Sequence, residues 1–355
     1  MIARMILAAL LVLAQPCLAQ QIPDLRIATY KADLSRKGPG LLLRDILSGQ
    51  DAQIAAVVAV LADLNAYILV LTDVDFDYDL IALSALADAL AAAGAPYPYR
   101  FAKQPNTGIA TGFDMDGDGR MGGPRDAQGF GYFAGQGGVA ILSRLEVDAP
   151  GFRDFSGFLW QDLPNNLIGD SLSAAMKLVQ RLSTTAHWDV PIILHNDQRL
   201  HLLIWHATPP VFDGPLDRNG RRNHDETAFW QALLDGALPM PPPAMPFVIL
   251  GDANLDPVAG DGRNGAIKSL LADPRVQDPA PKGTHNRVEP DQKGDPALDT
   301  ALYHFGGLRV DFVLPSSDLR VTGAGVMWPD DAAPNAATLA RASRHRPVWV
   351  DVALP

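Results

Sequence analysis

The sequence predicts an α/β fold, and two observations support this. Short apolar runs alternate along the chain with longer segments whose apolar residues recur at helical spacing. The strand-like runs are apolar on both faces, as in Phe247–Leu250, and such strands belong to sheets that are covered on both sides. A single large domain over residues 21–355 is expected, because no linker interrupts these residues.

The first half of the chain contains well-defined candidates for both kinds of element. Two apolar, β-rich runs predict strands, and an apolar run after a long glycine-rich stretch predicts a third: Leu25–Tyr30, Ile68–Thr72 and Gly138–Leu142. Two alanine- and leucine-rich segments with apolar residues at helical spacing predict helices: Ile54–Leu64 and Leu80–Ala93. Residues 103–137 show neither pattern and are expected to form an irregular elaboration.

The second half continues the series. Four apolar runs predict strands: Leu200–Trp205, Phe247–Leu250, Leu308–Leu314 and Pro347–Val352. A helix is expected at Asp225–Leu234, and the proline-rich run Pro239–Pro246 is interpreted as a loop before a strand. Residues 150–200 are expected to be a second irregular elaboration.

The first 20 residues predict a secretory signal peptide rather than part of the fold. Arg4 precedes the apolar run Met5–Ala14, and Cys17-Leu18-Ala19 forms a small-x-small cleavage pattern. The apolar run is too short to span a bilayer, and no later stretch is long and apolar enough to do so. We therefore expect a periplasmic or secreted protein.

Composition limits the classes of function. The only cysteine, Cys17, lies in the leader, so the mature chain has neither a disulfide nor a cysteine metal ligand. The formal net charge of −11 disfavours avid binding to nucleic acid, because phosphate backbones repel an acidic protein. Arg218, Arg221 and Arg222 form either a local basic patch or a solvated loop with salt bridges.

Polar side chains follow the predicted strands. Asp252 and Asn254 come directly after one strand, and His206 follows another. Asp311 lies within a late strand, and His345 precedes the last one. Strand ends that converge on one face of a sheet form ligand sites in layered α/β folds, so we expect these five residues to form one site. The Asp and Asn alone would equally suit a turn that ends a strand.

The order of these motifs resembles the endonuclease/exonuclease/phosphatase superfamily, which includes DNase I-like nucleases, and in particular a bacterial exported branch. The stretches that carry the resemblance are Leu25–Gly40, Asn106–Arg144, His206–Trp230, Gly251–Pro257, Arg309–Pro315 and Ser343–Val348. The resemblance implies a DNase I-like four-layer sandwich, with two central mixed β-sheets flanked by helices.

The resemblance also implies roles in phosphate-ester hydrolysis. Asp252 would orient the attacking water, and Asn254 would donate a hydrogen bond to the transition state. His345 would contact the scissile phosphate, with Asp311 buried behind it. His206 would be a second phosphate contact or the acid for the leaving group. A Mg²⁺ or Mn²⁺ ion would ordinarily assist.

Three positions depart from the family pattern. Lys31 stands where the family has Asn, Asp73 where it has Glu, and Arg344 where it has Asp. Asp73 then remains the one ligand of a degenerate metal site, with Asp75, Asp77 and Asp79 close by in sequence. The two added cations oppose a divalent ion, so we expect impaired metal binding.

Four basic or polar side chains are predicted to bind the substrate. They are Lys31, Arg344, Arg222 and Asn223. The leading hypothesis is an exported phosphodiesterase or phosphomonoesterase. The alternative is a metal-independent or non-catalytic protein that binds a phosphate ligand. Nucleic acid, phospholipid head groups and small sugar phosphates all suit the core residues.

An acidic loop is a separate candidate metal site. Asp114, Asp116 and Asp118 have the D-x-D-x-D-G spacing of calcium-binding loops. The twelfth position is Arg125 instead of a bidentate Glu, so an acidic surface turn is the alternative. A bound Ca²⁺ would brace residues 103–137.

Overall fold

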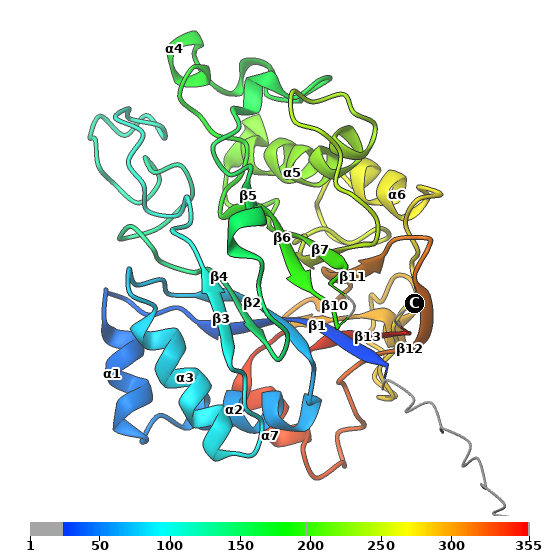
Figure 1. Ribbon diagram of the computed structural model, residues 1–355. Helices are drawn as coiled ribbons and strands as arrows, with labels where there is room; N and C mark the ends of the chain where they lie inside the picture. The colour runs from blue at the N-terminus through cyan, green and yellow to red at the C-terminus, as the bar shows by residue number, and fades with distance from the viewer. Residues whose placement is uncertain (1–23, 196, 354–355) are drawn as a thin grey trace, which may run out of the picture.

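Two mixed β-sheets lie face to face in the computed structural model, which describes residues 24–195 and 197–353 (Figure 1). The predicted signal peptide lies outside these residues. The first sheet has the order β12-β13-β1-β2-β4-β3 and is antiparallel except for the β1–β2 pair. Its strands are β1 (Leu25–Leu34), β2 (Ile68–Val74), β3 (Tyr99–Ala102), β4 (Gly138–Ser143), β12 (Arg320–Val326) and β13 (Val348–Ala353).

The second sheet has the order β11-β8-β7-β6-β5, and its one parallel pair is β7–β8. Its strands are β5 (Arg153–Asp154), β6 (Ala186–Ile193), β7 (Arg199–His206), β8 (Phe247–Asp252) and β11 (Asp311–Pro315). A separate hairpin consists of β9 (Ala301–Tyr303) and β10 (Gly306–Leu308). The two sheets together carry most of the predicted strands.

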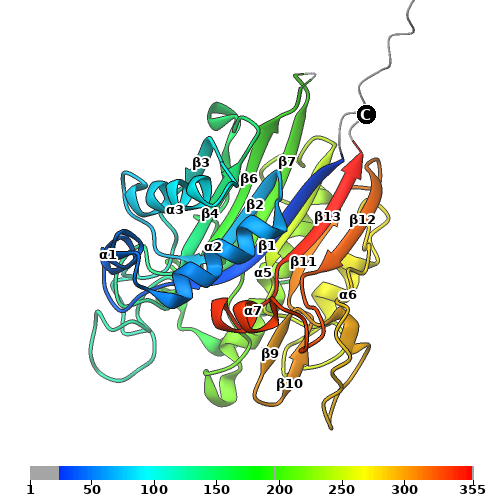
Figure 2. The same cartoon turned by 90° about the horizontal axis from the view of Figure 1, so that it is seen from below.

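Helices cover the outer face of each sheet, which completes four layers (Figure 2). The first sheet is covered by α1 (Leu41–Ser48), α2 (Ala52–Leu64), α3 (Ile81–Ala92) and α7 (Ala336–Ala342), and the second by α5 (Arg218–Leu234) and α6 (Gly265–Leu271). Short helices lie in the connections: α4 (Ala174–Lys177), η1 (Ala149–Gly151), η2 (Trp160–Asp162), η3 (Gly169–Ser171), η4 (Gly214–Leu216) and η5 (Pro296–Leu298). The predicted α/β sandwich with two central mixed sheets is confirmed.

Local chemistry explains where the helices begin. The Asp51 side chain accepts hydrogen bonds from the main-chain N–H groups of Gln53 and Ile54, so α2 starts two residues before its apolar pattern. Similarly, the Asp213 carboxylate accepts from the main-chain N–H groups of Asn219 and Gly220. The helix predicted from Asp225 therefore begins earlier, at Arg218.

Two sequence expectations are wrong. Residues 150–200 contain β6, a fully interior strand whose polar residues His187 and Asp189 obscure its apolar pattern. The run Leu308–Leu314 is broken between β10 and β11, because the N–H groups of Val310 and Asp311 both donate to the Thr300 hydroxyl. Residues 103–137 contain only isolated bridges, as expected, and project to one side of the sheets (Figure 1).

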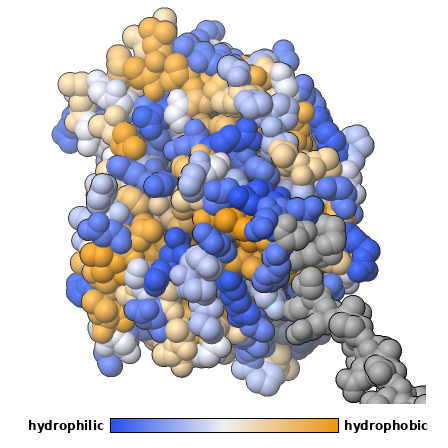
Figure 3. All heavy atoms as spheres, in the orientation of Figure 1, coloured by the Kyte–Doolittle hydropathy of each residue, from blue (hydrophilic) through white to orange (hydrophobic). Residues whose placement is uncertain are grey.

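Hydrophilic and hydrophobic residues are interspersed on the face of the molecule seen in Figure 3. Among the described residues, no single helix is long and apolar enough to cross a membrane. By length and composition alone, α1 and α2, which are bent by 77° relative to one another, meet that test together.

Candidate functional site

Strand ends from both sheets bring most of the predicted site residues together. Asp252 ends β8, and its two neighbours across the second sheet are His206 on β7 and Asp311 on β11. Lys31 approaches from β1 of the first sheet and bonds to Asp252. Lys31 and His206 also line a cavity of about 640 Å³, together with Asp73 from the end of β2.

The pair of Lys31 and Asp252 lies at the centre of the site. Lys31 Nζ donates to Asp252 Oδ2 at 2.9 Å, and the carboxylate is completely buried. Burial alone would lower the pKa of the Lys31 ammonium, but attraction to Asp252 and Asp73 outweighs burial and raises it. Burial would likewise raise the pKa of Asp252, but attraction to Lys31 and His345 holds it below its ordinary value. Both groups are therefore ionised at neutral pH.

Asn254 lies in a turn at the end of β8, which is the alternative that the sequence analysis gave for Asp252 and Asn254. Its main-chain N–H donates to Asp252 Oδ1 at 2.8 Å, and its backbone has a φ of 48°. Its side-chain Nδ2 donates to the carbonyl of Ala207 at 2.8 Å. The Asn254 amide thus connects the loops that follow β8 and β7, and its role as a transition-state donor stays a prediction.

His345 and Asp311 form a buried pair. His345 Nδ1 lies 2.8 Å from Asp311 Oδ2, and the same oxygen accepts from the Thr300 hydroxyl at 2.8 Å. Burial raises the pKa of Asp311, while the charge of His345 opposes this effect. The carboxylate holds the imidazole in one orientation, with Nδ1 directed to Asp311.

His206 is a neutral imidazole. Its Nε2 lies 3.4 Å from Asp252 Oδ2. Burial and the nearby charge of Lys31 lower the pKa of His206 to about 3. An uncharged ring at neutral pH favours the predicted role as a phosphate contact over that of a charged acid for the leaving group.

Arg344 lies apart from the cavity that contains Lys31. It lines a shallow groove of about 400 Å³ with Asp33 and Arg36, among other residues. Its guanidinium carbon lies 5.9 Å from the centroid of the Tyr303 ring. Lys31 and Arg344 thus line different cavities, and both charges act on the Tyr303 phenol between them in the site.

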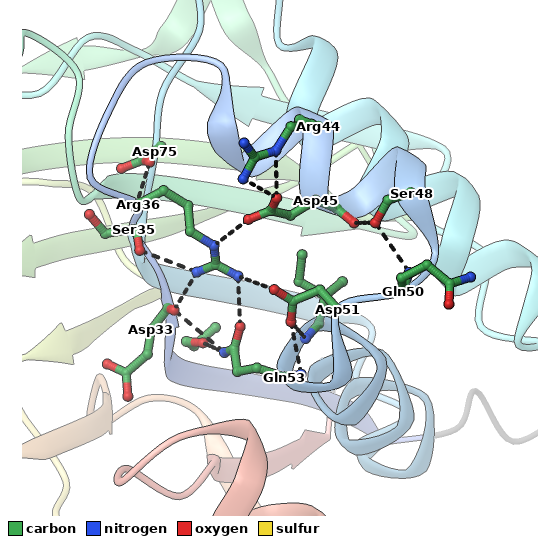
Figure 4. A network of polar contacts seen from close by, with 12 residues as sticks. Asp33, Ser35, Arg36, Arg44, Asp45, Ser48, Gln50, Asp51, Gln53 and Asp75 are labelled. Atoms are coloured by element: carbon green, nitrogen blue, oxygen red, sulfur yellow. Dashed lines mark hydrogen bonds and ion pairs between the residues drawn. The ribbon is translucent and has the colours of Figure 1, made fainter.

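The other acids after β2 have structural contacts. Asp75 accepts from the main-chain N–H groups of Arg36 and Gly137, at 2.8 and 3.0 Å. Asp77 accepts from the first N–H groups of α3. Figure 4 shows Asp75 beside the network in which Arg36 contacts Asp45. Asp75 and Asp77 thus fix the loops around the site, Asp79 is exposed, and a part for these acids beside Asp73 stays a prediction.

Two of the three arginines at the start of α5, Arg218 and Arg222, line the cavity that contains Lys31. Arg222 is buried, and its guanidinium donates to the carbonyl oxygens of Leu182, Gln128, Arg181 and Ser183 at 2.7–3.1 Å. Arg218 and Arg221 also donate to main-chain carbonyls. Arg222 is thus held at the wall of the cavity by main-chain carbonyls, and its role as a substrate contact stays a prediction.

Asn223 and Glu226 on α5 hold the loops that carry the site residues. Asn223 Nδ2 donates to the carbonyls of Thr208 and Ala253, both at 2.7 Å. Glu226 accepts from the main-chain N–H groups of Thr184 and Thr208, at 2.5 and 2.8 Å. The loops after β7 and β8 are thereby fixed relative to each other, so the contacts of Asn223 are those of a positioning residue.

The acidic loop has three carboxylates within reach of one ion. Ligand oxygens of Asp114, Asp116 and Asp118 lie within 4.8 Å of one another. Asp114 also accepts from the main-chain N–H groups of Gly117 and Gly119, at 2.7 and 2.8 Å. The turn is formed as its spacing suggests, and calcium binding there stays a prediction.

The site at Asp252 does not fit a divalent cation. Oxygen or nitrogen atoms of Asp252, Asp311 and His345 also lie within 4.8 Å of one another. However, Asp252 already binds the Lys31 ammonium, and Asp311 binds Thr300 and His345. A divalent ion about 4 Å from that ammonium would be repelled by roughly 8 kcal/mol at an effective dielectric constant of about 20, which cancels its attraction to one carboxylate at the same distance. The cation at this site is Lys31.

We predict that Asp73→Asn increases stability at neutral pH. Burial raises the pKa of Asp73 from 3.8 to about 6, with Lys31 opposing. The folded protein therefore binds this proton more tightly than the unfolded chain does, and the free energy of unfolding falls by about 3 kcal/mol as the pH rises from about 4 through 6. Asn does not ionise, so the Asp73→Asn variant lacks this fall in the free energy of unfolding. Asn also tolerates the backbone φ of 59° at this position.

Denaturant unfolding of both proteins at pH 4, 5, 6 and 7 measures this effect. The wild-type free energy of unfolding should fall across the series, and that of Asp73→Asn should fall less. Equal slopes for the two proteins would contradict the assignment to Asp73.

Comparison with known proteins identifies relatives of this fold. The profile of the Endonuclease/Exonuclease/phosphatase family matches residues 46–345. No curated protein matches the sequence. One similar solved structure is an endonuclease/exonuclease/phosphatase from Beutenbergia cavernae DSM 12333, with a TM-score of 0.56 and 17% identity over 94% of this chain and 72% of that chain.

Two further solved structures are similar. A family protein from Leptotrichia buccalis C-1013-b has a TM-score of 0.51 and 15% identity, over 93% of this chain and 100% of its own. One from Bacteroides thetaiotaomicron has a TM-score of 0.50 and 14% identity, over 93% of this chain and 97% of its own. At such identities the likeness establishes the shared fold.

Proposed function

Because this chain belongs to the endonuclease/exonuclease/phosphatase family, we propose that it hydrolyses a phosphate ester, with the Lys31 ammonium in the place of a divalent cation. The observation that carries the proposal is the ion pair between the buried Asp252 and Lys31, which lines the cavity. Phosphoryl transfer depends on positioning and on neutralising charge at the phosphoryl oxygens. An ammonium group can supply that charge.

The neighbouring residues have complementary roles in the proposed reaction. Asp252 is an ionised carboxylate and orients the attacking water. Lys31 and His345 contact the phosphoryl oxygens, and His206 adds a neutral contact. Asp311 keeps the His345 imidazole in its orientation.

The cavity supports a small ester as the substrate. Its volume of about 640 Å³ is in the range of small-molecule sites. Phe130, Phe212 and Leu216 line its outer part and are more than half exposed, so they can pack against an organic group next to the phosphate. The net charge of −11 supports a small ester over nucleic acid.

We further propose that the protein acts in the periplasm or outside the cell. The apolar run Met5–Ala14 and the cleavage pattern that follows it support this proposal. N-terminal sequencing of the protein from the periplasmic fraction should show cleavage near residue 20. Protein that keeps its leader and stays in the cytoplasm would contradict it.

Hydrolysis of bis(p-nitrophenyl) phosphate tests the proposed function. We expect turnover that persists in chelator, because Lys31 supplies the positive charge. His345→Ala should lower kcat/KM by at least about 100-fold, and it is also the control for contaminating enzymes. If chelator abolishes turnover and Mg²⁺ restores it, the proposed role of Lys31 is wrong. If Ca²⁺ restores turnover and Mg²⁺ does not, the loss of turnover in chelator is explained by removal of Ca²⁺ from the acidic loop.

Absence of turnover in a folded sample would favour the alternative, a protein that binds a phosphate ligand without hydrolysing it. Titration calorimetry with inorganic phosphate then decides between the two readings. Binding that depends on Lys31 supports the alternative, and no binding excludes both.

A further inference from the structure

The hairpin β9–β10 lies directly beside the histidine of the site. Ala301 forms a bridge with His345, and the N–H of Leu302 donates to the carbonyl of Arg344 at 3.0 Å. Thr300, the residue before β9, donates to Asp311. The start of β9 and the residue before it are thus fixed to the two members of the His345–Asp311 pair, and Tyr303 is the last residue of β9.

Three neighbours hold the Tyr303 ring. It meets the His345 ring edge-on, with centroids 6.2 Å apart and planes at 80°. It stacks on Phe305 with centroids 5.3 Å apart and planes at 2°, and the Arg344 guanidinium lies 5.9 Å from its centroid. The ring is half-buried, and its phenol oxygen has no hydrogen-bond partner within residues 24–195 and 197–353.

The phenol lies in the electric field of the central ion pair. Burial and the negative charge of Asp252 raise the pKa of Tyr303 above its ordinary value, and Lys31 opposes them. The phenol is therefore a neutral O–H donor at neutral pH. Lys31 already donates one hydrogen bond to Asp252, and His345 Nδ1 faces Asp311, so the Tyr303 phenol adds a donor to those that remain on Lys31.

We propose that Tyr303 is a further catalytic residue, whose phenol donates a hydrogen bond to an oxygen of the bound phosphate at the position of the departing group. Its position beside His345 and its unpaired hydroxyl carry this inference, which rests on the proposed function. A hydrogen bond at that position stabilises the negative charge that develops as the bond between phosphorus and the leaving oxygen breaks. This contribution is largest when the leaving group is a weak acid.

Tyr303→Phe removes the hydroxyl and keeps the ring contacts, so two diesters of similar shape can test the proposal. With diphenyl phosphate, whose leaving phenol is weakly acidic, kcat/KM should fall about 100-fold. With bis(p-nitrophenyl) phosphate, whose leaving group needs little assistance, it should fall less than about tenfold. Tyr132→Phe, which changes an exposed tyrosine, is the matched control and should change neither value.

Equal losses on both diesters, or no loss on either, would overturn the role of Tyr303. If the wild-type protein hydrolyses neither diester, the proposed function fails separately, and the donor is tested by calorimetry with inorganic phosphate. Tyr303→Phe should then weaken phosphate binding about tenfold while Tyr132→Phe does not. Equal affinities for wild type and Tyr303→Phe would overturn the contact.

Discussion

Lys31→Met is expected to lower kcat/KM for metal-free phosphodiester hydrolysis by about 10²- to 10³-fold, the range found when one preorganised electrostatic contact is removed. Met keeps the length and apolar stem of the side chain but removes the ammonium that the cavity presents to the substrate. The measurement is steady-state hydrolysis of bis(p-nitrophenyl) phosphate in chelator. Lys103→Met, at an exposed position, should have no effect.

Loss of activity has to be separated from loss of folding. Lys31→Met leaves the buried Asp252 carboxylate without its cationic partner, which should cost about 3–5 kcal/mol of stability. The double variant Lys31→Met/Asp252→Asn removes the unpaired charge and should regain stability without regaining activity. If Lys31→Met is stable and fully active, the ammonium has no part in the reaction.

Lys31→Asn adds a sharper comparison. This variant restores the residue type that the family has at this position and removes the charge that repels a divalent ion. We expect metal-free turnover to fall as in Lys31→Met, and Mg²⁺ to recover part of it through Asp252 and Asp73. Wild-type turnover should not respond to Mg²⁺. A wild-type response as large as that of the variant would show that Lys31 does not exclude the ion.

Arg222→Ala is expected to lower the free energy of unfolding by about 3–5 kcal/mol, because several buried acceptors lose their donor together. The guanidinium holds the segment Arg181–Ser183 and the carbonyl of Gln128 against α5. Its removal also leaves Glu226 without its neighbouring positive charge. Urea unfolding monitored by tryptophan fluorescence measures the change.

An arginine without such contacts is the control. Arg320 is exposed at the start of the edge strand β12, and Arg320→Ala should change stability by less than about 0.5 kcal/mol. If Arg222→Ala were as stable as the wild type but bound phosphate more weakly, the original interpretation of Arg222 as a substrate contact would be correct.

Local patterns in the sequence were sufficient for much of the fold. Most predicted strands are found at or within a few residues of their predicted bounds, because a strand buried on both faces must be apolar throughout. The interior strand β6 was missed, since Asp189 is satisfied by Arg153 and His201 from neighbouring strands. Pairs of this kind leave no periodic signal along the chain.

The site likewise has features that the sequence predicts and features that only the tertiary structure shows. The sequence alone predicted Asp252, Asn254, Asp311, His206 and His345 as site residues, because each stands at or next to a core strand and their motifs resemble those of the family. It also predicted that Lys31 would oppose a metal ion. The bond from Lys31 to Asp252 joins residues 221 positions apart, and only the packing of one sheet on the other brings them within 2.9 Å.

Contacts between residues far apart in the sequence also place the remaining candidate residues. Main-chain carbonyls hold Arg222 at the wall of the cavity that contains Lys31, whereas Arg344 lines a separate groove. Tyr303 lies in a short hairpin without a sequence motif, and its place beside His345 depends on the bridge at Ala301. A sequence specifies which side chains are available at strand ends, whereas burial and long-range pairing determine which of them meet, and with what charge.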